Sequence, residues 1–493
     1  MNVEMFSQHL LAPQRRAHLP ADACSGAAGG AACGDLIRVS VALDRSSPEG
    51  SVLDAGFDAS GCGAAIAAGS ATVALVRGKP LLDAARVGAS EIAAELGGLS
   101  PAKQHAAELA ADALHRALGW ALRRQATLAP APARTLVAMS GGVDSAVAAL
   151  IVAERGEQAV AVTLELWSDP ENDGDRSCCS AQAVRSARAL AQSMGMAHFS
   201  IDLREEFRAG VVDGWLADHA AGLTPNPCVR CNGNVRLDAM LELADRLGAQ
   251  KLATGHYART ERGADGEALL RIALDEAKDQ SYALAALSPN SLARLSFPLG
   301  ELTKPQVREL AGEAGLEVAH RPDSQDLCFL AGTRSADFLE RHGGLARRPG
   351  AIVDREGRTL GEHGGVHTLT VGQRHGLGIG GGEPLYVIST DPRANTVTVG
   401  PREQLRTSRV SVREVTLHRD GGRVDAVKVR YRGGRMPCRV EGEPCAGAHG
   451  QVEVRMLEQI ERTAPGQIAC LYAGDVIVGH GTIARGSDAS PGA

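Results

Sequence analysis

The chain has 493 residues with a formal net charge of −6, and 44% of its residues are hydrophobic against 22% charged. This length exceeds what one hydrophobic core usually organises, so we expect two to four domains in a globular protein of ordinary composition. No apolar run is long enough to cross a bilayer and the N-terminus lacks the layout of a secretory signal, which predicts a cytoplasmic protein without membrane contact.

The N-terminal block has the pattern of an α+β domain. Two runs of alternating apolar and polar residues between Leu36 and Asp58, separated by the turn SSPEG, predict a β-hairpin. The Ala-rich segment from Cys62 to Arg77 and the segment from Pro101 to Trp120 predict helices. We assign this domain to residues 1–125, because the Ala/Pro-rich stretch 126–133 is typical of a linker.

Residues 134–335 alternate strand and helix patterns. The runs TLVAM, AVAVTLEL, HFSID and KLATGH predict buried strands, with helical patterns after the first run and from Ala181. This alternation predicts a doubly wound parallel sheet. Gly-rich turns between short β-like runs then predict a small β-rich domain at 336–405 and a C-terminal β-barrel at 406–493.

The sequence SGGVDS at Ser140–Ser145 lies between the first strand of the sheet and a helix, where open α/β folds bind ligands. Its glycines let backbone N–H groups face a phosphate, its serines offer hydroxyls, and the helix dipole favours an anion. It is not a Walker loop, and Asp144 suits a magnesium-bridged pyrophosphate. The segment resembles the PP-loop ATP pyrophosphatases, which adenylate a carbonyl oxygen; a serine-capped Gly-rich turn is the plainer alternative.

Eleven cysteines in such a chain favour reduced thiols, metal ligands or catalytic groups over disulfides. An adenylated carbonyl needs a nucleophile, and three thiols are candidates. Cys228 and Cys231 lie in the proline-stiffened stretch TPNPCVRCN, and Cys328 lies in DSQDLCFL. Packing is the plainer reading for Cys438, Cys445 and Cys470, which lie in β-like runs.

Four further segments complete a pattern: ATGHYAR at 253–259, KDQSYAL at 278–284, FPLGELTKPQVREL at 297–310 and TVGQRHGLGIGGGEPLYV at 370–387. Together with SGGVDS and the cysteine segments they closely resemble the tRNA-specific 2-thiouridylase family, from about residue 134 to the end. The resemblance implies adenylation of the C2 oxygen of the wobble uridine and then sulfur transfer, giving 2-thiouridine, AMP and pyrophosphate. It implies ATP and Mg²⁺ as cofactors, the tRNAs for Lys, Glu and Gln as substrates, and a cysteine desulfurase or another sulfur donor as partner.

The resemblance also implies roles for single residues. Cys231 corresponds to the catalytic thiol and Cys328 to the thiol that carries the persulfide sulfur. ATP would bind at Ala138, Met139, Ser140, Gly141, Gly142, Val143, Asp144, Ser145, Leu164 and Gly255. The target base would meet Asn226, Pro227 and Cys228, and the tRNA would meet Lys278, Asp279, Gln280, Arg430 and Tyr431. The last two fall in a basic stretch, Arg402 to Arg439, which holds 11 Lys or Arg against 4 Asp or Glu.

Cys228 departs from some relatives, which carry aspartate at this place. With Cys231 and Cys328 it offers three thiolates that could hold an iron–sulfur cluster with one iron open for sulfur, an alternative to the persulfide that the sequence leaves open. The pair Cys178 and Cys179 also resembles the family, and buried structural thiols are the reading we adopt for it.

Two other functions fit parts of the pattern. A different PP-loop AMP-forming ligase would use the same loop but would need neither Cys231 nor Cys328. A noncatalytic iron–sulfur or sulfur carrier would keep only a relic nucleotide domain, and the intact SGGVDS and KDQ motifs weigh against it. The sequence leaves the oligomeric state open.

The N-terminal segments ACGDLIRVSV, GCGAAIAAGSATVALVRGK and LSPAKQHAAELAADALHRAL resemble the NifU/IscU scaffolds of iron–sulfur assembly, over about residues 5–120. Matching ligands are Cys33, Asp35, Cys62 and His105, but Ala106 replaces the third scaffold cysteine. These residues would still suit iron, zinc or a persulfide relay, and Cys24 would be a substitute ligand if its loop folded back. A degenerate scaffold that docks a sulfur donor is the alternative, and in either case fusion raises the local concentration of the delivery module.

Overall fold

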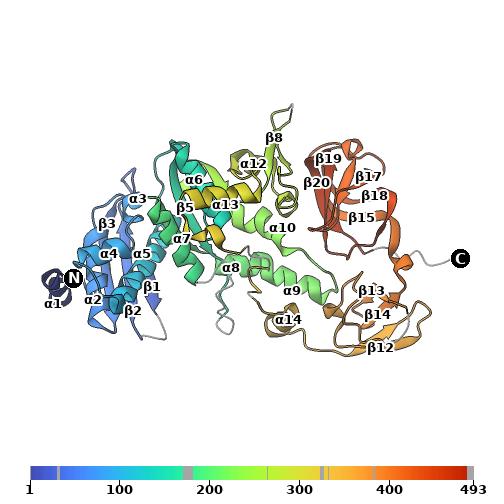
Figure 1. Ribbon diagram of the computed structural model, residues 1–493, viewed down its shortest axis with the longest axis horizontal. Coiled ribbons are helices and arrows are strands. Elements are labelled where there is room, and N and C mark those ends of the chain that lie inside the picture. The colour runs from blue at the N-terminus through green and yellow to red at the C-terminus, as the bar shows by residue number, and fades with distance from the viewer. Residues whose placement is uncertain are drawn as a thin grey trace. The chain divides into compact units, whose positions relative to one another are not determined.

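The computed structural model describes residues 2–29, 34–169, 181–263, 265–322, 327–330, 332–380 and 383–485. The chain divides into two compact units. Figure 1 shows the chain with its helices and strands labelled. The first unit comprises Met1–Glu205, Ala239–His256 and Arg294–Ala331, and the second comprises Glu206–Asp238, Tyr257–Ala293 and Gly332–Ala493. Across the described ranges, no helix combines the length and apolar character that spanning a membrane requires.

The N-terminal region of the first unit is an antiparallel sheet in the order β1-β2-β3, covered by helices. Its strands are β1 (Cys24–Gly29), β2 (Leu36–Leu43) and β3 (Val52–Ser60), and its helices are α1 (Val3–Leu11), α2 (Gly63–Val76), α3 (Leu81–Ala84), α4 (Ala89–Glu95) and α5 (Gln104–Arg124). The hairpin of β2 and β3 and the helices α2 and α5 confirm the predicted α+β pattern. Strand β1 was not predicted, because its small residues carry little strand propensity. They are needed for packing: a Cβ at Gly26 would lie 2.3 Å from the carbonyl oxygen of Ala113 on α5.

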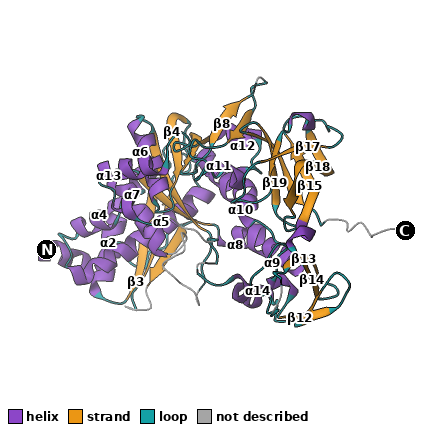
Figure 2. Cartoon of the chain, turned by 45° about the vertical axis from the view of Figure 1, so that its right-hand side comes forward, coloured by secondary structure: helices purple, strands orange, loops and turns teal. Residues whose placement is uncertain are grey.

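The remainder of the first unit is built on a parallel five-stranded sheet in the order β10-β7-β4-β5-β6. The strands are β4 (Ala131–Ala138), β5 (Gln158–Glu165), β6 (Ala197–Asp202), β7 (Ala249–Thr254) and β10 (Leu295–Ser296). Helices α6 (Val143–Glu154), α7 (Ala181–Ser193), α11 (Leu237–Arg246) and α13 (Lys304–Glu313) alternate with these strands (Figure 2). The predicted doubly wound α/β class is therefore confirmed, with β4 in the middle of the sheet.

Helix α5 joins these two regions by packing against the edge strand β6. Gly119 permits the close approach, because a Cβ there would lie 2.0 Å from the carbonyl oxygen of Ser200. At the same interface the buried His115 ring contacts the carbonyl oxygens of His198 at 2.8 Å and Val87 at 2.9 Å. Within residues 126–133, the expected linker, the Leu128 N–H donates to the Arg246 carbonyl at 2.7 Å, and residues 131–133 already belong to β4. The domain boundary itself stays a prediction.

We expect this interface to weaken in acid, because it buries two neutral histidines. Burial, with a smaller contribution from the Arg188 charge, lowers the pKa of His115 to about 4, and burial also lowers the pKa of His198. Their stabilising effect is fully present above pH 6.5 and is lost as the pH falls toward 4, at a cost of about 3 kcal/mol for His115. Denaturant unfolding between pH 8 and 4.5 measures this loss.

His115→Gln is the control for that series, because glutamine keeps hydrogen-bonding capacity and does not titrate. Its unfolding free energy should fall less steeply below pH 6.5 than that of the unsubstituted chain. Identical pH profiles for the two proteins would contradict the assignment of the acid sensitivity to His115.

The C-terminal part of the second unit contains a four-stranded sheet and a barrel. The sheet has the order β12-β11-β14-β13 around a small core that includes Ile352, Val387 and Val397. The barrel follows the order β15-β18-β17-β16-β19-β20 and closes through pairing of β15 with β20, as predicted. The strands are β11 (Gly350–Val353), β12 (Thr359–His363), β13 (Tyr386–Asp391), β14 (Thr396–Gly400), β15 (Arg406–Leu417), β16 (Ala426–Lys428), β17 (Met436–Val440), β18 (Gly447–Glu461), β19 (Ile468–Ala473) and β20 (Val476–Ile483).

The barrel continues beyond β20 into a hairpin from the middle of the chain. This hairpin consists of β8 (Arg259–Arg262) and β9 (Ala268–Arg271), and β9 pairs with β20. The remaining helices are α8 (Arg204–Phe207), α9 (Asp213–Ala220), α10 (Pro227–Cys231), α12 (Pro289–Arg294) and α14 (Ser335–Gly343). The KDQ segment at 278–280 follows this hairpin in the chain. The pairing of β9 with β20 therefore places the segment next to the barrel.

Candidate functional sites

The SGGVDS loop lies at the carboxyl end of the central strand β4 and leads into α6. Its serines close the loop on itself: the Ser145 hydroxyl donates to the Gly142 carbonyl at 3.0 Å and accepts from the Ser140 N–H at 3.1 Å. Gly141 has a φ of +74°, which a side chain would strain. A Cβ at Gly142 would meet only the Ser140 hydroxyl within 4 Å, so the loop leaves room at this glycine, whereas a Cβ at Gly141 would lie 3.0 Å from the Ala183 carbonyl oxygen.

Gly255, just beyond β7, packs directly on this loop. A Cβ at this position would lie 2.7 Å from both the Asp144 carbonyl carbon and the Ser145 nitrogen, so only glycine fits. Leu164 is buried near the carboxyl end of the adjacent strand β5. Two of the expected ATP contacts thus come from the strands that flank β4, although their role stays a prediction. The neighbouring His256 is oriented by a contact between its Nδ1 and the Thr254 hydroxyl at 2.9 Å.

Two cationic side chains, those of Lys304 and Arg321, contact the SGGVDS loop, and the sequence predicted no role for either residue. Lys304, the first residue of α13, is only 7% exposed, and its Nζ donates to both carboxylate oxygens of Asp144 at 2.7 and 2.9 Å. Arg321 donates to the Gly141 carbonyl at 3.2 Å. Both contact residues of the Ser140–Ser145 loop, and the FPLGELTKPQVREL motif was the signal from which Lys304 could have been found.

In the second unit, the TPNPCVRCN stretch forms the short helix α10. Asn226 caps it by accepting the Cys228 N–H at 3.1 Å, and Pro227 occupies the first turn, where no N–H is needed. Cys228 is exposed and Cys231 is buried. A π-helical turn, Asn232–Arg236, follows directly, a geometry frequent at functional sites.

The start of this stretch is anchored to the barrel. The Thr224 N–H donates to the Pro465 carbonyl at 2.8 Å, and the Gln467 side-chain amide donates to the Thr224 carbonyl at 2.6 Å. Asn226 also hydrogen-bonds to the Tyr282 hydroxyl, which donates to the Ile468 carbonyl at 2.8 Å. The loop before Cys228 is thereby fixed against strand β19.

Tyr431 of the basic stretch lies close to the same loop. Burial, together with the nearby thiol of Cys228 and carboxylate of Asp279, raises the pKa of Tyr431. Its ring contacts that of Tyr282 edge-on, with centroids 6.0 Å apart, and the Lys428 ammonium lies over the Tyr282 ring at 5.9 Å. The structure therefore brings the expected base-contacting residues together with the expected tRNA-contacting Tyr431.

Of the KDQ residues, Asp279 and Gln280 form hydrogen bonds that hold their own loop, and Lys278 supplies a positive charge. Asp279 accepts hydrogen bonds from the Ser281 N–H and hydroxyl, and Gln280 exchanges two hydrogen bonds with the Tyr257 backbone at 2.9 and 3.0 Å. These bonds fix the loop, whereas Lys278 carries the charge that would suit a phosphate. Arg430 is exposed at the barrel surface, where it donates to the Arg462 carbonyl at 3.0 Å.

Cys328 is half-buried in a turn of the first unit. The next residue, Phe329, packs edge-on against Trp167, with ring centroids 6.5 Å apart. Because Trp167 lies two residues beyond β5, this turn is held at the carboxyl edge of the parallel sheet, the edge that carries the SGGVDS loop. Cys328 and Cys231 belong to different units.

The N-terminal region assembles three of its expected ligands. Ligand atoms of Asp35, Cys62 and His105 all lie within 4.8 Å of one another. Asp35 is 4% exposed and bonds both partners: its carboxylate accepts from the Cys62 N–H at 2.7 Å and contacts the His105 Nε2 at 3.0 Å. The Cys62 N–H bond, followed by the bond to His105, lowers the pKa of Asp35. A Cβ at Gly61 would lie 2.0 Å from an Asp35 carboxylate oxygen, so glycine is required beside the cluster.

The substitute role suggested for Cys24 is wrong. Cys24 is buried at the start of β1, where it faces Val41. Asp35 lies next to Leu36 at the other end of the β1–β2 pair, where Leu36 faces Gly29. Five residues of extended strand separate these ends by about 17 Å. Ala106, at the place of the missing third cysteine, is fully buried.

The cysteines of the barrel, which the structure describes, lie outside this group of ligands. Cys33, Cys178 and Cys179 lie outside the described residues. Cys438 and Cys470 are buried in the barrel, where burial raises the pKa of each thiol, while Cys445 is exposed. Packing therefore accounts for Cys438 and Cys470.

Comparison with known families covers nearly the whole chain. Residues 4–127 match the family described as NifU-like N terminal domain, and residues 133–332 match the tRNA methyl transferase HUP domain. Residues 336–401 match the tRNA methyl transferase PRC-barrel domain, and residues 405–483 match the aminomethyltransferase beta-barrel domain.

Individual relatives carry more specific names. The chain is 43% identical to the bifunctional protein NifU/MnmA of Rubrobacter xylanophilus, across 97% of each chain. It is also 43% identical to the tRNA-specific 2-thiouridylase MnmA of a Bradyrhizobium strain, across 70% of this chain and 87% of the relative. Among solved structures, the U34-tRNA thiolase NcsA of Methanococcus maripaludis with its [4Fe-4S] cluster is 19% identical, with 43% of this chain and 67% of that chain aligned at a TM-score of 0.26, too slight a likeness to bear on function.

Proposed function

The chain belongs to the tRNA-specific 2-thiouridylase family, in the form that carries a NifU-like domain ahead of the thiouridylase, and on this premise we propose that it replaces the C2 oxygen of the wobble uridine by sulfur in an ATP-dependent reaction. The observation that carries the proposal is that one chain holds both an intact SGGVDS loop, contacted by Lys304, and a thiol-bearing helix close to Tyr431. A methyltransferase, which the names of two matching family models would suggest, needs neither feature.

ATP would bind with its phosphates at the glycines of the Ser140–Ser145 loop and its adenosine toward Leu164 and Gly255. The uridine O2 would attack the α-phosphorus, forming a C2–O–AMP bond and releasing pyrophosphate. Asp144 would hold a magnesium ion, which would neutralise charge on the leaving pyrophosphate. The Ser140 hydroxyl and the N-terminus of α6 would stabilise the same charge, and so would the Ser145 hydroxyl once it turned from the Gly142 carbonyl.

Sulfur transfer then uses two thiols. The terminal sulfur of a Cys328 persulfide would attack C2, and AMP would leave with the former O2. The Cys231 thiolate would attack the Cys328 sulfur, forming a Cys231–Cys328 disulfide and expelling 2-thiouridine as its thiolate. An external thiol reductant would restore both cysteines for the next cycle. A cysteine desulfurase or another persulfide donor is the partner that reloads Cys328.

The base and the tRNA would be held by residues of the second unit. Asn226, Pro227 and Cys228 would line the pocket for the extruded uracil, whose unstacking from the anticodon loop is cheap. Lys278 and Arg430 supply cationic groups for phosphates, and Tyr431 supplies an aromatic ring beside Cys228. We take Asp279 and Gln280 to act by fixing Lys278. We also propose that the protein works in the cytoplasm.

A cluster on Cys228, Cys231 and Cys328 is the alternative use of the thiols, and it would supply an open iron for sulfide. The variant Cys228→Ala distinguishes the persulfide mechanism from the cluster mechanism, because only the cluster requires the Cys228 thiol. With a persulfide, thiolation by Cys228→Ala should remain within about threefold of the unsubstituted protein, and the iron content of the two proteins should be the same. Iron analysis and absorption spectra of anaerobically prepared proteins check this. Iron in the unsubstituted protein that disappears with Cys228 would favour the cluster.

The three ligand groups of the NifU-like region also fit a metal ion. Asp35, Cys62 and His105 supply a carboxylate, a thiol and an imidazole, a donor set that suits zinc or ferrous iron. We propose that this region binds one such ion or relays persulfide sulfur through Cys62, which is exposed. Metal would supply a Lewis acid that holds the Cys62 thiol as thiolate.

The overall proposal is tested with tRNA that lacks 2-thiouridine. The protein is incubated with this tRNA, ATP, magnesium and a persulfide donor, and the digested nucleosides are analysed by mass spectrometry. We expect 2-thiouridine only when ATP is present, with AMP and pyrophosphate in equal amounts. A methylated nucleoside, or no product at all, would overturn the proposal.

A further inference from the structure

A cavity of about 240 Å³ lies where the NifU-like region meets the parallel sheet. Strand β1 and helix α5 form one wall, and the carboxyl end of β6 forms the other. Three guanidinium groups line it, those of Arg116, Arg123 and Arg204, against the single carboxylate of Asp202. The carboxyl ends of parallel strands are where open α/β sheets bind ligands, and the lining residues carry a net positive charge.

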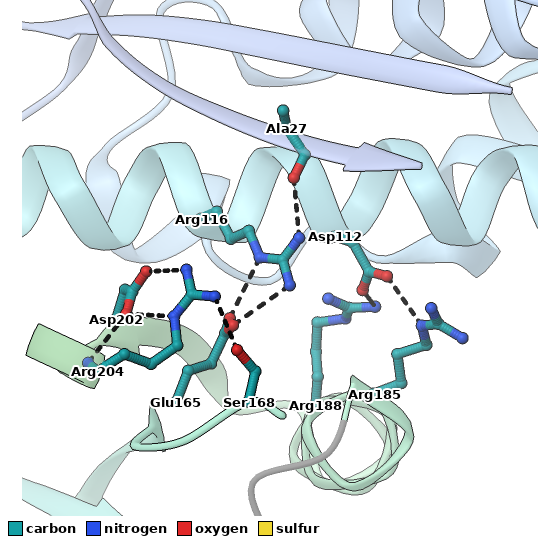
Figure 3. A network of polar contacts seen from close by, with 9 residues as sticks. All are labelled: Ala27, Asp112, Arg116, Glu165, Ser168, Arg185, Arg188, Asp202 and Arg204. Carbon is teal, nitrogen blue, oxygen red and sulfur yellow. Dashed lines mark hydrogen bonds and ion pairs between the residues drawn. The ribbon is translucent and has the colours of Figure 1, made fainter. Parts of the chain in front are cut away.

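The arginines are held in place before any ligand arrives, as Figure 3 shows for Arg116 and Arg204. Arg116 donates to both oxygens of Glu165 at 3.2 Å each, and a third N–H donates to the Ala27 carbonyl at 2.8 Å. Arg204 is paired with Asp202, and Arg123 donates to the Asp202 carbonyl at 2.7 Å. Each guanidinium has five N–H donors, so a fixed position does not exhaust its capacity to bind an oxyanion.

Ser200 adds a buried polar group to the cavity wall. It is 4% exposed, and its hydroxyl has no hydrogen-bond partner among the described residues. Side chains alternate along a strand, so the Ser200 side chain lies on the same face of β6 as those of His198 and Asp202, and the His198 ring lies 5.6 Å from the His115 ring of α5. A buried hydroxyl without a partner is costly, and an acceptor oxygen in the cavity would satisfy it.

The rim of the cavity carries an aromatic ring. Trp120 on α5 is 39% exposed, and the Arg123 guanidinium lies over its ring at 5.4 Å. An exposed aromatic ring next to arginines is the combination with which proteins bind single-stranded or looped nucleic acid, by stacking beside phosphate contacts.

We propose that this cavity binds a backbone phosphate of the tRNA substrate, with Arg123, Arg204 and Ser200 as its donors. The proposal rests on the proposed function, because it takes tRNA as the substrate. Seven of the ten lining residues belong to the NifU-like region, so a thiouridylase without that region would lack the cavity. The fused region thus acts as part of the tRNA-binding surface in addition to any role in sulfur delivery.

The test measures tRNA affinity of the full-length protein as a function of salt concentration. The double variant Arg123→Gln/Arg204→Gln should weaken binding roughly five- to twentyfold and lower the slope of log K against log salt by about 1. Ser200→Ala, which removes one hydroxyl and leaves the ion pairs intact, should weaken binding about two- to threefold. Arg77→Gln is the matched control, since Arg77 is also a half-exposed arginine of the NifU-like region that faces an aspartate, Asp54, at 3.7 Å.

Thermal unfolding of each variant shows whether the fold is kept, and inorganic phosphate serves as a second probe. Phosphate binding that is lost in the double variant while tRNA affinity stays unchanged would assign the cavity to a small anion and overturn the proposal. Unchanged affinity and salt slope in both the double variant and Ser200→Ala would overturn it too. If the unsubstituted protein binds tRNA but makes no 2-thiouridine, the proposed function fails, whereas the tRNA-affinity comparison still decides this inference.

Discussion

Replacing Cys328 with serine is expected to reduce 2-thiouridine formation by at least about 10³-fold, because a serine hydroxyl cannot carry a transferable sulfur atom. Adenylation should survive, since the SGGVDS loop and its partners Lys304 and Gly255 are unchanged. The measurement is a single turnover with tRNA and radiolabelled ATP, in which pyrophosphate release and nucleoside products are followed together. Pyrophosphate without thiolated product is the expected pattern.

Cys231→Ser should interrupt the reaction one step later. Sulfur already joined to C2 would remain linked to Cys328, so a covalent protein–tRNA adduct should accumulate and dissolve on addition of a thiol reductant. Gel analysis without reductant detects such an adduct. In the unsubstituted protein, peptide mapping after one turnover should instead find the Cys231–Cys328 disulfide.

Cys445→Ser is the matched control for both variants, because Cys445 is an exposed thiol of the barrel outside the proposed chemistry. It should thiolate tRNA at the normal rate. Full activity of Cys231→Ser or Cys328→Ser would refute the assigned roles. Loss of pyrophosphate release in Cys328→Ser would show that this residue supports adenylation and does not act only as a sulfur carrier.

The sequence predicted the architecture well where periodicity decides the fold. Buried parallel strands, the hairpin β2–β3 and the closed barrel all follow from local patterns. Strand β1 did not, because its residues are chosen for their small size against α5 and carry no apolar alternation. The error about Cys24 has the same origin, since strand register decides which end of the hairpin a residue occupies.

The candidate sites were predicted from motifs, and motifs carry no information about contacts over long separations. Asp144 and Lys304 are 160 residues apart in the chain and meet only because α13 packs against α6. Gly255 is a second example. The ATGHYAR motif indicates that this residue belongs to the site, but only the structure shows that glycine is required because the chain passes close to the Asp144 backbone. Asp279 and Gln280 were expected to contact the tRNA, but their side chains form hydrogen bonds within the protein that hold the loop carrying Lys278.

Lys304→Met is expected to weaken ATP binding by about 10²-fold, because it removes a buried cation from the phosphate-binding loop. The Lys304 ammonium is bonded to both Asp144 oxygens, so its removal takes away one of the positive charges that would balance Asp144 and the incoming phosphates. Like charges within a few ångströms in a partly buried site cost several kcal/mol before solvent screening, and Asp144 is exposed enough for screening to reduce this to about 2–3 kcal/mol. Titration calorimetry with ATP and magnesium measures the dissociation constant directly.

Two controls separate charge from packing at this position. Lys304→Arg keeps the cation and should bind ATP within about tenfold, since a guanidinium can still pair with Asp144 although its shape differs. Lys251→Met removes an exposed lysine from the neighbouring strand β7 and should leave the dissociation constant unchanged. If Lys304→Met bound ATP as tightly as Lys251→Met, Lys304 would pair with Asp144 without contributing to ATP binding, and the prediction would be wrong. If instead only Lys304→Met lost ATP while thermal unfolding showed it folded, the ion pair would be a built part of the nucleotide site, holding Asp144 in the position from which it meets magnesium.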